Sequence, residues 1–159
     1  MSVADLPLAP DVLGVVADHL SFNHSVTPPG HVHALAAESL ADPAVTVLTA
    51  RRRGALLGVG ALRRLDDEHA ELKSMHTVAA ARRQGVGATM VDGLLSLAAE
   101  RGFRRVSLET GTMAAFAPAR RLYRRCGFTV CPPFGSYTSN PWSVCMTISL
   151  GLDPAVGEA

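Results

Sequence analysis

Cysteine, net charge and long apolar runs are all scarce in this sequence. The three cysteines, Cys126, Cys131 and Cys145, are an odd number and form no Cys-x-x-Cys pair, so they make a poor disulfide framework. We interpret all three as buried small apolar residues of a reduced, cytoplasmic protein. The 15 Lys and Arg residues nearly balance the 14 Asp and Glu residues, which gives no global attraction to nucleic acid or to an anionic membrane.

Long apolar segments are missing as well. No run approaches the roughly 18–20 residues of a membrane span, and residues 1–5 lack the basic-then-apolar layout of a signal peptide. Internal repeats and a linker are also absent. A length of 159 residues favours a single domain. We therefore expect one domain over residues 1–159, with residues 1–10 and 153–159 loosely ordered.

What the sequence does contain is a regular succession of helix and strand patterns. Helical spacing of apolar residues predicts a helix capped by Asp11, one over residues 32–40, one over 88–101 and one that begins near Pro118. The strand at 71–78 closes an antiparallel meander and starts a strand–helix–strand unit, which predicts a parallel pair. The expected strands are 45–51, 55–63, 71–78, 105–110, 128–131 and 143–150.

The six residues Arg82 to Gly87, Arg-Arg-Gln-Gly-Val-Gly, lie between an expected strand and an expected helix. The first turn of a helix carries about four N–H groups without an intrahelical partner and a partial positive charge. Glycine has no Cβ, so a ligand can approach this backbone closely, and the neighbouring arginines add charge-assisted hydrogen bonds. The segment therefore suits a phosphate or pyrophosphate group.

Two familiar phosphate loops do not fit these residues. A P-loop requires Lys after its last glycine, and Ala88 follows Gly87. A dinucleotide-binding fingerprint requires a third glycine where Met90 stands. The structural alternative is a glycine-rich helix entry with solvated arginines, and the hexapeptide alone leaves that alternative open.

Two motifs together resemble the GNAT superfamily of N-acetyltransferases. Arg82–Gly87 matches the Arg/Gln-x-x-Gly-x-Gly/Ala acyl-CoA pyrophosphate loop, and Arg121–Phe128 is similar to the signature Leu-Tyr-x-x-x-Gly-Phe. The resemblance covers residues 45–150. Three further segments, residues 28–35, 108–111 and 133–137, resemble a bacterial small-molecule or amino-acid-like subgroup. The resemblance to the superfamily implies an α/β fold with a mixed, mostly antiparallel sheet of about six to seven strands. A central parallel pair would be splayed at the acyl-CoA site, and about four helices would flank the sheet.

The resemblance also implies acetyl-CoA as the co-substrate and no metal. The thioester and pantetheine would lie on the backbone of Met75, His76, Thr77 and Val78. The pyrophosphate would lie on Arg82, Arg83, Gln84, Gly85, Val86, Gly87, Ala88 and Thr89, and Tyr123 would contact the cofactor too. The sequence departs from the family at Phe116, where many members have an Asn that contacts the CoA arm. We therefore expect pantetheine to be held differently here.

Three side chains are candidates for proton transfer. Tyr123 is the candidate acid, because a phenol with a pKa near ~10 is protonated at neutral pH and can donate to the departing thiolate. A Tyr that packs its ring and only hydrogen-bonds CoA is the alternative. Glu71 is the candidate base by analogy with carboxylates at that place in the family. Glu109, on the neighbouring strand, can converge with Glu71 at the cleft. A water relay, or His76 as the base, stays open.

The expected acceptor contacts are His31, Glu109 and Tyr137. Tyr137 belongs to a late loop, which is a usual place for substrate contacts, and ordinary loop packing is the alternative for this ring. His31 and His33 are not expected to bind a metal, because positions i and i+2 do not share a helix face. No Cys or carboxylate cluster joins them in the sequence either.

These features predict an enzyme that transfers an acetyl group from acetyl-CoA to the amine of a small-molecule or amino-acid-like acceptor. Transfer would occur by direct attack in a ternary complex. A homodimer is compatible with the resemblance, since late strands often pair across a two-fold axis in this family. Two alternatives remain, which are a non-catalytic acyl-CoA-binding sensor on the same fold and an enzyme that acetylates protein N-termini or lysines.

Overall fold

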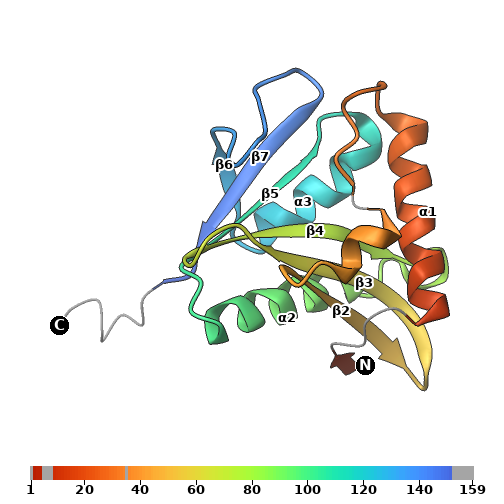
Figure 1. Cartoon of the computed structure of the whole chain (residues 1–159). Helices are drawn as coiled ribbons and strands as arrows, with labels where there is room; N and C mark the ends of the chain where they lie inside the picture. Colours follow the sequence, from red (N-terminus) through yellow and green to blue (C-terminus); the bar gives the residue numbers. More distant parts are fainter. Residues whose placement is uncertain (1, 5–8, 35, 152–159) are drawn as a thin grey trace.

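The computed structural model describes residues 2–4, 9–34 and 36–151, and its centre is a seven-stranded sheet of order β1-β2-β3-β4-β5-β7-β6 (Figure 1). Of the described neighbouring strands, β4 and β5 pair in parallel and the others pair antiparallel. This confirms the mixed, mostly antiparallel sheet with a parallel pair. The strands are β1 (Ser2–Ala4), β2 (Val45–Arg52), β3 (Ala55–Arg64), β4 (His69–Thr77), β5 (Arg105–Gly111), β6 (Thr129–Cys131) and β7 (Ser143–Ser149).

Three α-helices and three short 3₁₀ helices accompany the sheet in the described residues. The α-helices are α1 (Pro10–Val26), α2 (Val86–Glu100) and α3 (Ala117–Arg125). The 3₁₀ helices are η1 (Ala37–Ala41), η2 (Ala79–Ala81) and η3 (Ala114–Phe116). The first α-helix begins after Ala9, and Asp11 lies in its first turn and pairs with Arg51 at 2.7 Å, so Asp11 is not the cap.

The helix expected over residues 32–40 is wrong. The described residues 31–34 are irregular, η1 supplies a short 3₁₀ turn after them, and Leu35 lies outside the described residues. A helix of that length is marginal unless tertiary packing supports it. Here the packing favours another course, because the rings of His31 and His33 lie against Trp142 and Tyr137 of the late loop. The structure therefore has three α-helices in its described part rather than about four.

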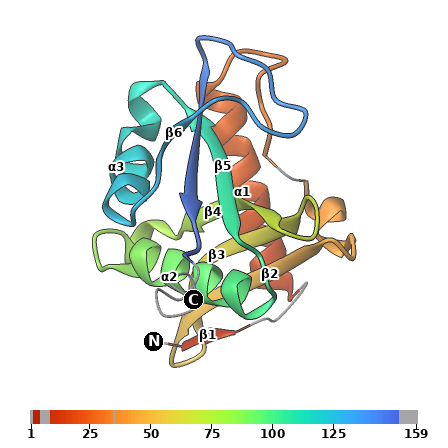
Figure 2. The same cartoon turned by 90° about the vertical axis from the view of Figure 1, so that its left-hand side faces the viewer.

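The sheet carries a different apolar cluster on each face. Leu48 belongs to the larger cluster with Met90 and Leu94 of α2, whereas the adjacent Val47 packs with Val12 of α1. Successive strand residues point to opposite faces, so a continuous apolar run can supply both clusters. Figure 2 shows α1 behind the strands, α2 in the foreground and α3 to the left of β5 and β7.

Residues near the N-terminus take part in the fold. Of the ends expected to be loose, Ser2–Ala4 form β1 against β2 and Pro10 begins α1. Residues 5–8 and 152–159 lie outside the described residues. No described helix combines the length and the hydropathy that a membrane crossing needs.

Two irregularities in β4 create the space for a site. Residues 69–71 pair with β5, and no further pairs join the two strands, so they part beyond Glu71 (Figure 1). On the other edge of β4, Ala61 faces Lys73 and Val59 faces His76, so Gly60 opposes two residues in a β-bulge. Within that bulge Ser74 has a left-handed φ of 56°. The splayed central pair that the sequence predicted is therefore present.

Candidate functional site

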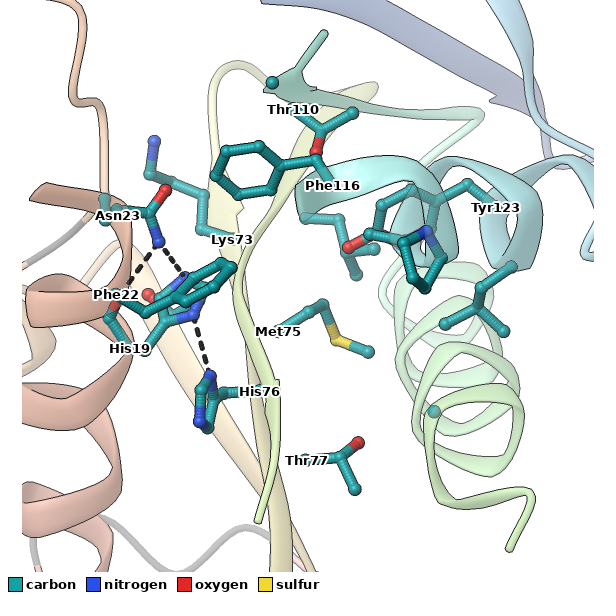
Figure 3. Close-up of a pocket in the computed structure, with 18 of the residues that line it drawn as sticks. His19, Phe22, Asn23, Lys73, Met75, His76, Thr77, Thr110, Phe116 and Tyr123 are labelled. Atoms are coloured by element: carbon teal, nitrogen blue, oxygen red, sulfur yellow. Dashed lines mark hydrogen bonds between the residues drawn. The ribbon is translucent and has the colours of Figure 1, made fainter. Parts of the chain in front are cut away.

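A cavity of about 610 Å³ opens where β4 and β5 part. Its walls come from α1, β4, the start of α2, the end of β5 and the η3–α3 segment (Figure 3). We call the part lined by Arg82, Arg83 and residues 85–88 the loop end, and the part lined by Glu71, Lys73 and Glu109 the acceptor end. The sequence predicts cofactor residues at the first end, and the candidate bases Glu71 and Glu109 lie at the second.

The loop end is a helix N-terminus with free backbone donors. Gly85 is the N-cap of α2, with a left-handed φ of 79°, and no side chain caps the helix there. Thr89 N–H bonds back to the Gly85 carbonyl at 3.1 Å, which leaves the N–H groups of the preceding turn for a ligand. Of the predicted pyrophosphate residues, the cavity is lined by Arg82, Arg83, Gly85, Val86, Gly87 and Ala88. An anion fits this uncapped terminus and its arginines.

Three predicted cofactor residues have other contacts. The Gln84 amide donates to the Ala80 carbonyl at 3.1 Å, and the Thr89 hydroxyl donates to the Gly85 carbonyl at 3.0 Å. Val78 N–H donates to the Leu57 carbonyl at 2.9 Å. All three residues lie outside the described cavity lining, and these contacts, two from side chains and one from the backbone, support the shape of the loop.

Gly87 has a packing reason as well as a binding one. A Cβ at this position would lie only 2.8 Å from Leu122 Cδ2. Leu122 belongs to α3, immediately before Tyr123, so the glycine lets the start of α2 pack closely against α3. The two sequence motifs therefore meet at one wall of the cavity.

Met75, His76 and Thr77 line the middle of the cavity, along the strand edge that the bulge exposes (Figure 3). His76 Nδ1 lies 3.1 Å from His19 Nδ1, and Asn23 donates to the His19 carbonyl at 2.9 Å. Burial lowers the pKa of His19 to about 4 and also lowers the pKa of His76. Both rings are therefore neutral at pH 7, and one N–H donates to the other ring.

Tyr123 extends from α3 toward this middle segment (Figure 3). Its side chain is buried, and its ring packs edge-on against Phe128 at 5.9 Å. Burial raises the pKa of Tyr123 well above its ordinary value. The phenol therefore carries its proton throughout the neutral pH range and is available as a donor.

The acceptor end contains a buried ion pair. Lys73 Nζ lies 3.2 Å from Glu71 Oε2, and the two side chains are 7% and 3% exposed. The Tyr137 hydroxyl accepts from Lys73 at 2.8 Å and donates to Glu71. Burial, together with the charge of Glu71, raises the pKa of Tyr137, so this hydroxyl stays protonated. The predicted residues Glu71 and Tyr137 are thus in direct contact, and Lys73 contacts both of them.

Glu109 lies on the same face of the sheet as Glu71 and Lys73, because Val106 and Leu108 point into the larger core cluster. Burial raises its pKa to about 7, the nearby charge of Glu71 adds to the rise and the charge of Lys73 opposes it. Among the described residues, its ion-pair partner within 4.0 Å is His33, with Nε2 at 3.9 Å from Oε2. Burial lowers the pKa of His33, so at pH 7 this ring is a neutral neighbour.

Of the three expected acceptor residues, Glu109 lines the cavity, whereas His31 and Tyr137 do not. The ring of His31 lies 6.4 Å from the ring of Trp142, at the late loop and outside the described cavity lining. Its role in acceptor binding stays a prediction. In the part of the chain that the structure describes, His, Cys, Asp and Glu side chains form no group of three or more that would hold a metal ion.

Several residues of the site were not predicted from the sequence. Lys73 could have been found, because it lies two positions after Glu71 and so shares its face of β4. Ser74 could not, since its positive φ is a tertiary feature, and its hydroxyl is the buried side-chain polar atom left without a hydrogen-bond partner among the described residues. The wall of α1 also carried no local signal. It contributes His19, Phe22 and Asn23.

Phe116, where the sequence departs from the family pattern, is buried at the cavity wall. Its ring packs edge-on against Phe22 of α1 at 5.5 Å between centroids. It also covers Gly111, where a Cβ would meet the ring at 2.2 Å. The position therefore supplies an aromatic wall in place of an amide.

Comparison with known sequences gives the same family. The model of the acetyltransferase (GNAT) family matches residues 15–128. The chain is 43% identical to the uncharacterized N-acetyltransferase YsnE of Bacillus subtilis (strain 168), over 87% of this chain and 92% of that protein. It is 40% identical to the uncharacterized N-acetyltransferase YedL of Escherichia coli (strain K12), over 89% of each chain.

Solved structures share the fold. A protein from Klebsiella pneumoniae assigned as an acyl-CoA N-acyltransferase aligns with a TM-score of 0.77 at 23% identity, over 94% of this chain and 97% of that one. A GNAT acetyltransferase from Elizabethkingia anophelis with bound acetyl-CoA aligns with a TM-score of 0.66 at 15% identity, over 94% and 97% of the two chains. With the family model and these relatives, the cavity, its uncapped helix terminus and the two motifs identify the chain as a member of the GNAT family of N-acetyltransferases.

Proposed function

We propose that this enzyme transfers an acetyl group from acetyl-CoA to the amine of a small-molecule or amino-acid-like acceptor, by direct attack in a ternary complex. The observation that carries the proposal is one cavity that joins an uncapped helix terminus to two carboxyl groups, the buried Glu71 and the partly buried Glu109. Such a cavity can hold both reactants at attack distance, which supplies much of the acceleration of an acyl transfer.

The loop end has the chemistry to hold the phosphates of CoA. Backbone N–H groups at the start of α2 meet an anion with the positive end of the helix dipole. Arg82 and Arg83 add charge, and both are exposed at the cavity rim. From there the strand edge of Met75 to Thr77 leads toward the acceptor end, in the direction that a pantetheine arm and thioester would take.

Glu109 is our candidate for the base. A general base works best with a pKa near the working pH, and the pKa of Glu109 is about 7. Glu71 fits this role less well, because its Oε2 already accepts from Lys73 and from Tyr137. In the proposed step the acceptor nitrogen bonds to the carbonyl carbon, the carbon–sulfur bond breaks, and Glu109 takes the proton from nitrogen directly or through water.

Tyr123 is our candidate for the acid. The departing thiolate has an ordinary pKa near ~8.5, far below that of a buried phenol. Tyr123 must therefore donate its proton to sulfur while the carbon–sulfur bond is breaking. The phenolate of Tyr123 later takes a proton from solvent. A hydrogen bond from Tyr123 that stabilises the thiolate is the smaller role, and it would still favour cleavage.

Free-thiol release from acetyl-CoA tests the proposal across amines, amino acids and peptides. We expect release with small amines, and a loss of turnover in Glu109→Gln and in Tyr123→Phe. Calorimetric titration with CoA runs in parallel. Binding of CoA without release for any acceptor would favour the sensor, and release with peptides alone would favour a protein acetyltransferase. A protein that does not bind CoA would overturn the assignment of the loop end.

A further inference from the structure

Lys73 is an unusual component of an amine-binding cavity. Its Nζ is itself a primary ammonium, it lines the acceptor end, and its side chain is 7% exposed. It is held at 3.2 Å by Glu71 and at 2.8 Å by the Tyr137 hydroxyl. The side chains of β4 and the late loop thus fix one positive charge inside the space that must receive the substrate amine.

The charges at the acceptor end would be balanced by one further cation. Lys73 and Glu71 neutralise each other, and no Lys or Arg forms an ion pair with Glu109 in the described part of the chain. His33, His19 and His76 are neutral at pH 7, because burial lowers the pKa of each ring. The three arginines that line the cavity, Arg82, Arg83 and Arg125, belong to the loop end and the adjoining end of α3.

We propose that Lys73 is a built-in cation that takes the place of a second substrate ammonium, so that the acceptor is a primary amine carrying a single positive charge. The inference rests on the proposed acetyl transfer and specifies its substrate class. The ammonium of such an acceptor binds Glu109, the one carboxyl group of the site without a strong cationic partner. It then gives its proton to that carboxyl group before or during attack.

The remaining wall favours an apolar body for this amine. Phe22 and Phe116 lie edge to face at 5.5 Å and line the same cavity. A second ammonium beside these rings and beside Lys73 would meet a like charge in a partly desolvated space, which is unfavourable. Diamines and polyamines that are short enough to keep a second ammonium inside this space are therefore disfavoured by charge.

The test compares monoamines and α,ω-diamines of equal chain length, from propane to octane, by free-thiol release. We expect the wild-type protein to prefer propylamine over propane-1,3-diamine by about 100-fold in kcat/KM, as the Coulomb energy of a nearby like charge implies. The preference should shrink as the chain grows and the second ammonium reaches solvent. In Lys73→Met, short diamines should gain on monoamines, because Glu71 is left free to accept the second ammonium. Lys73→Arg keeps the charge and should keep the wild-type preference.

The outcomes separate this inference from the proposed function. Equal turnover of monoamines and short diamines by the wild-type protein would overturn the role of Lys73, while the acetyl transfer would stand. An absence of thiol release with every amine would remove the proposed function itself. If Lys73→Met is unfolded by circular dichroism, the chain-length series on the wild-type protein and on Lys73→Arg still decides the question. A preference that does not change with chain length would count against a charge effect.

Discussion

The two ends of the cavity are built in different ways. The loop end comes from one continuous stretch, residues 82–88, and offers backbone N–H groups at the start of α2. The acceptor end gathers side chains from α1, β4, β5 and the loop that follows β6, which are far apart in the chain. The first end suits a ligand that a whole family shares, and the second can change from one member to the next without disturbing the first.

The largest expected effect comes from replacing one carboxylate oxygen of Glu109, which should affect the acceptor end and not the loop end. Glu109→Gln removes the base and should lower kcat/KM for the acceptor on the order of 100-fold or more, as for other general bases. The KM for acetyl-CoA should change little, because Glu109 lies at the acceptor end. Steady-state kinetics with each substrate varied in turn gives both values, and Glu100→Gln, on the exposed end of α2, is the matched control.

The pH profile of the same pair sharpens the assignment. A base must be deprotonated to accept a proton, so wild-type kcat/KM should fall as the pH drops below about 7, the pKa of Glu109. The fall should be absent from the residual activity of Glu109→Gln. A variant that keeps the wild-type profile would transfer the role to Glu71 or to a water relay.

Tyr123→Phe should have the next largest effect. The substitution keeps the packing of the ring on Phe128 and removes only the hydroxyl. We expect kcat to fall about 100-fold, at the lower end of general acid catalysis, with little change in thermal stability. Acyl-CoA analogues that carry a better leaving thiol should reduce the deficit. A deficit that is the same for every leaving group would mean that the hydroxyl only positions CoA.

Much of the loop end and of the sheet could be predicted from the sequence. The meander, the parallel pair and the start of α2 follow from local patterns, because strand alternation and helix spacing are set by neighbouring residues. The glycines of the loop could be identified for the same reason, because they belong to a short local motif. Their second role was not, since the contact between Gly87 and Leu122 joins positions 35 residues apart (122 − 87).

Only some residues of the acceptor end could be predicted from the sequence. Glu71, Glu109 and Tyr137 were named from their places in the sequence, but the ion pair of Lys73 with Glu71 changes what Glu71 can do. His33 reaches Glu109 from a segment that was expected to be a helix. That prediction failed because residues 31–34 gain contacts with the late loop that no local pattern encodes.

The histidine pair between the two ends should set the acid stability of the fold. The pKa of His19 is about 4 in the folded protein against 6.5 ordinarily, so the unfolded chain binds more protons as the pH falls from 6.5 to 4. The free energy of unfolding is therefore unaffected by this ring above pH 6.5, and it decreases as the pH falls from 6.5 towards 4. At pH 5 the loss relative to pH 7 should be about 2 kcal/mol.

Urea unfolding at the two pH values measures this loss, and His19→Gln is the informative variant. Glutamine keeps a polar group near His76 but does not titrate, so the difference between pH 7 and pH 5 should shrink. The part that remains reports His76, whose pKa is lowered as well. An unchanged difference would show that the acid sensitivity lies elsewhere, for example at the carboxyl groups of the acceptor end.

The smallest effect should come from the arginines of the loop end, because exposed charges are screened by solvent and salt. Arg82→Gln combined with Arg83→Gln should raise the KM for acetyl-CoA about tenfold, through lost charge-assisted hydrogen bonds to phosphate, and should leave kcat nearly unchanged. The effect should weaken at high salt. Arg124→Gln, exposed on α3 and outside the described cavity lining, is the control. If the double variant raised the KM of the acceptor instead, the two arginines would serve the acceptor end of the cavity and not the loop end. The contrast between a shared, backbone-built end and an individual, side-chain-built end would then no longer hold.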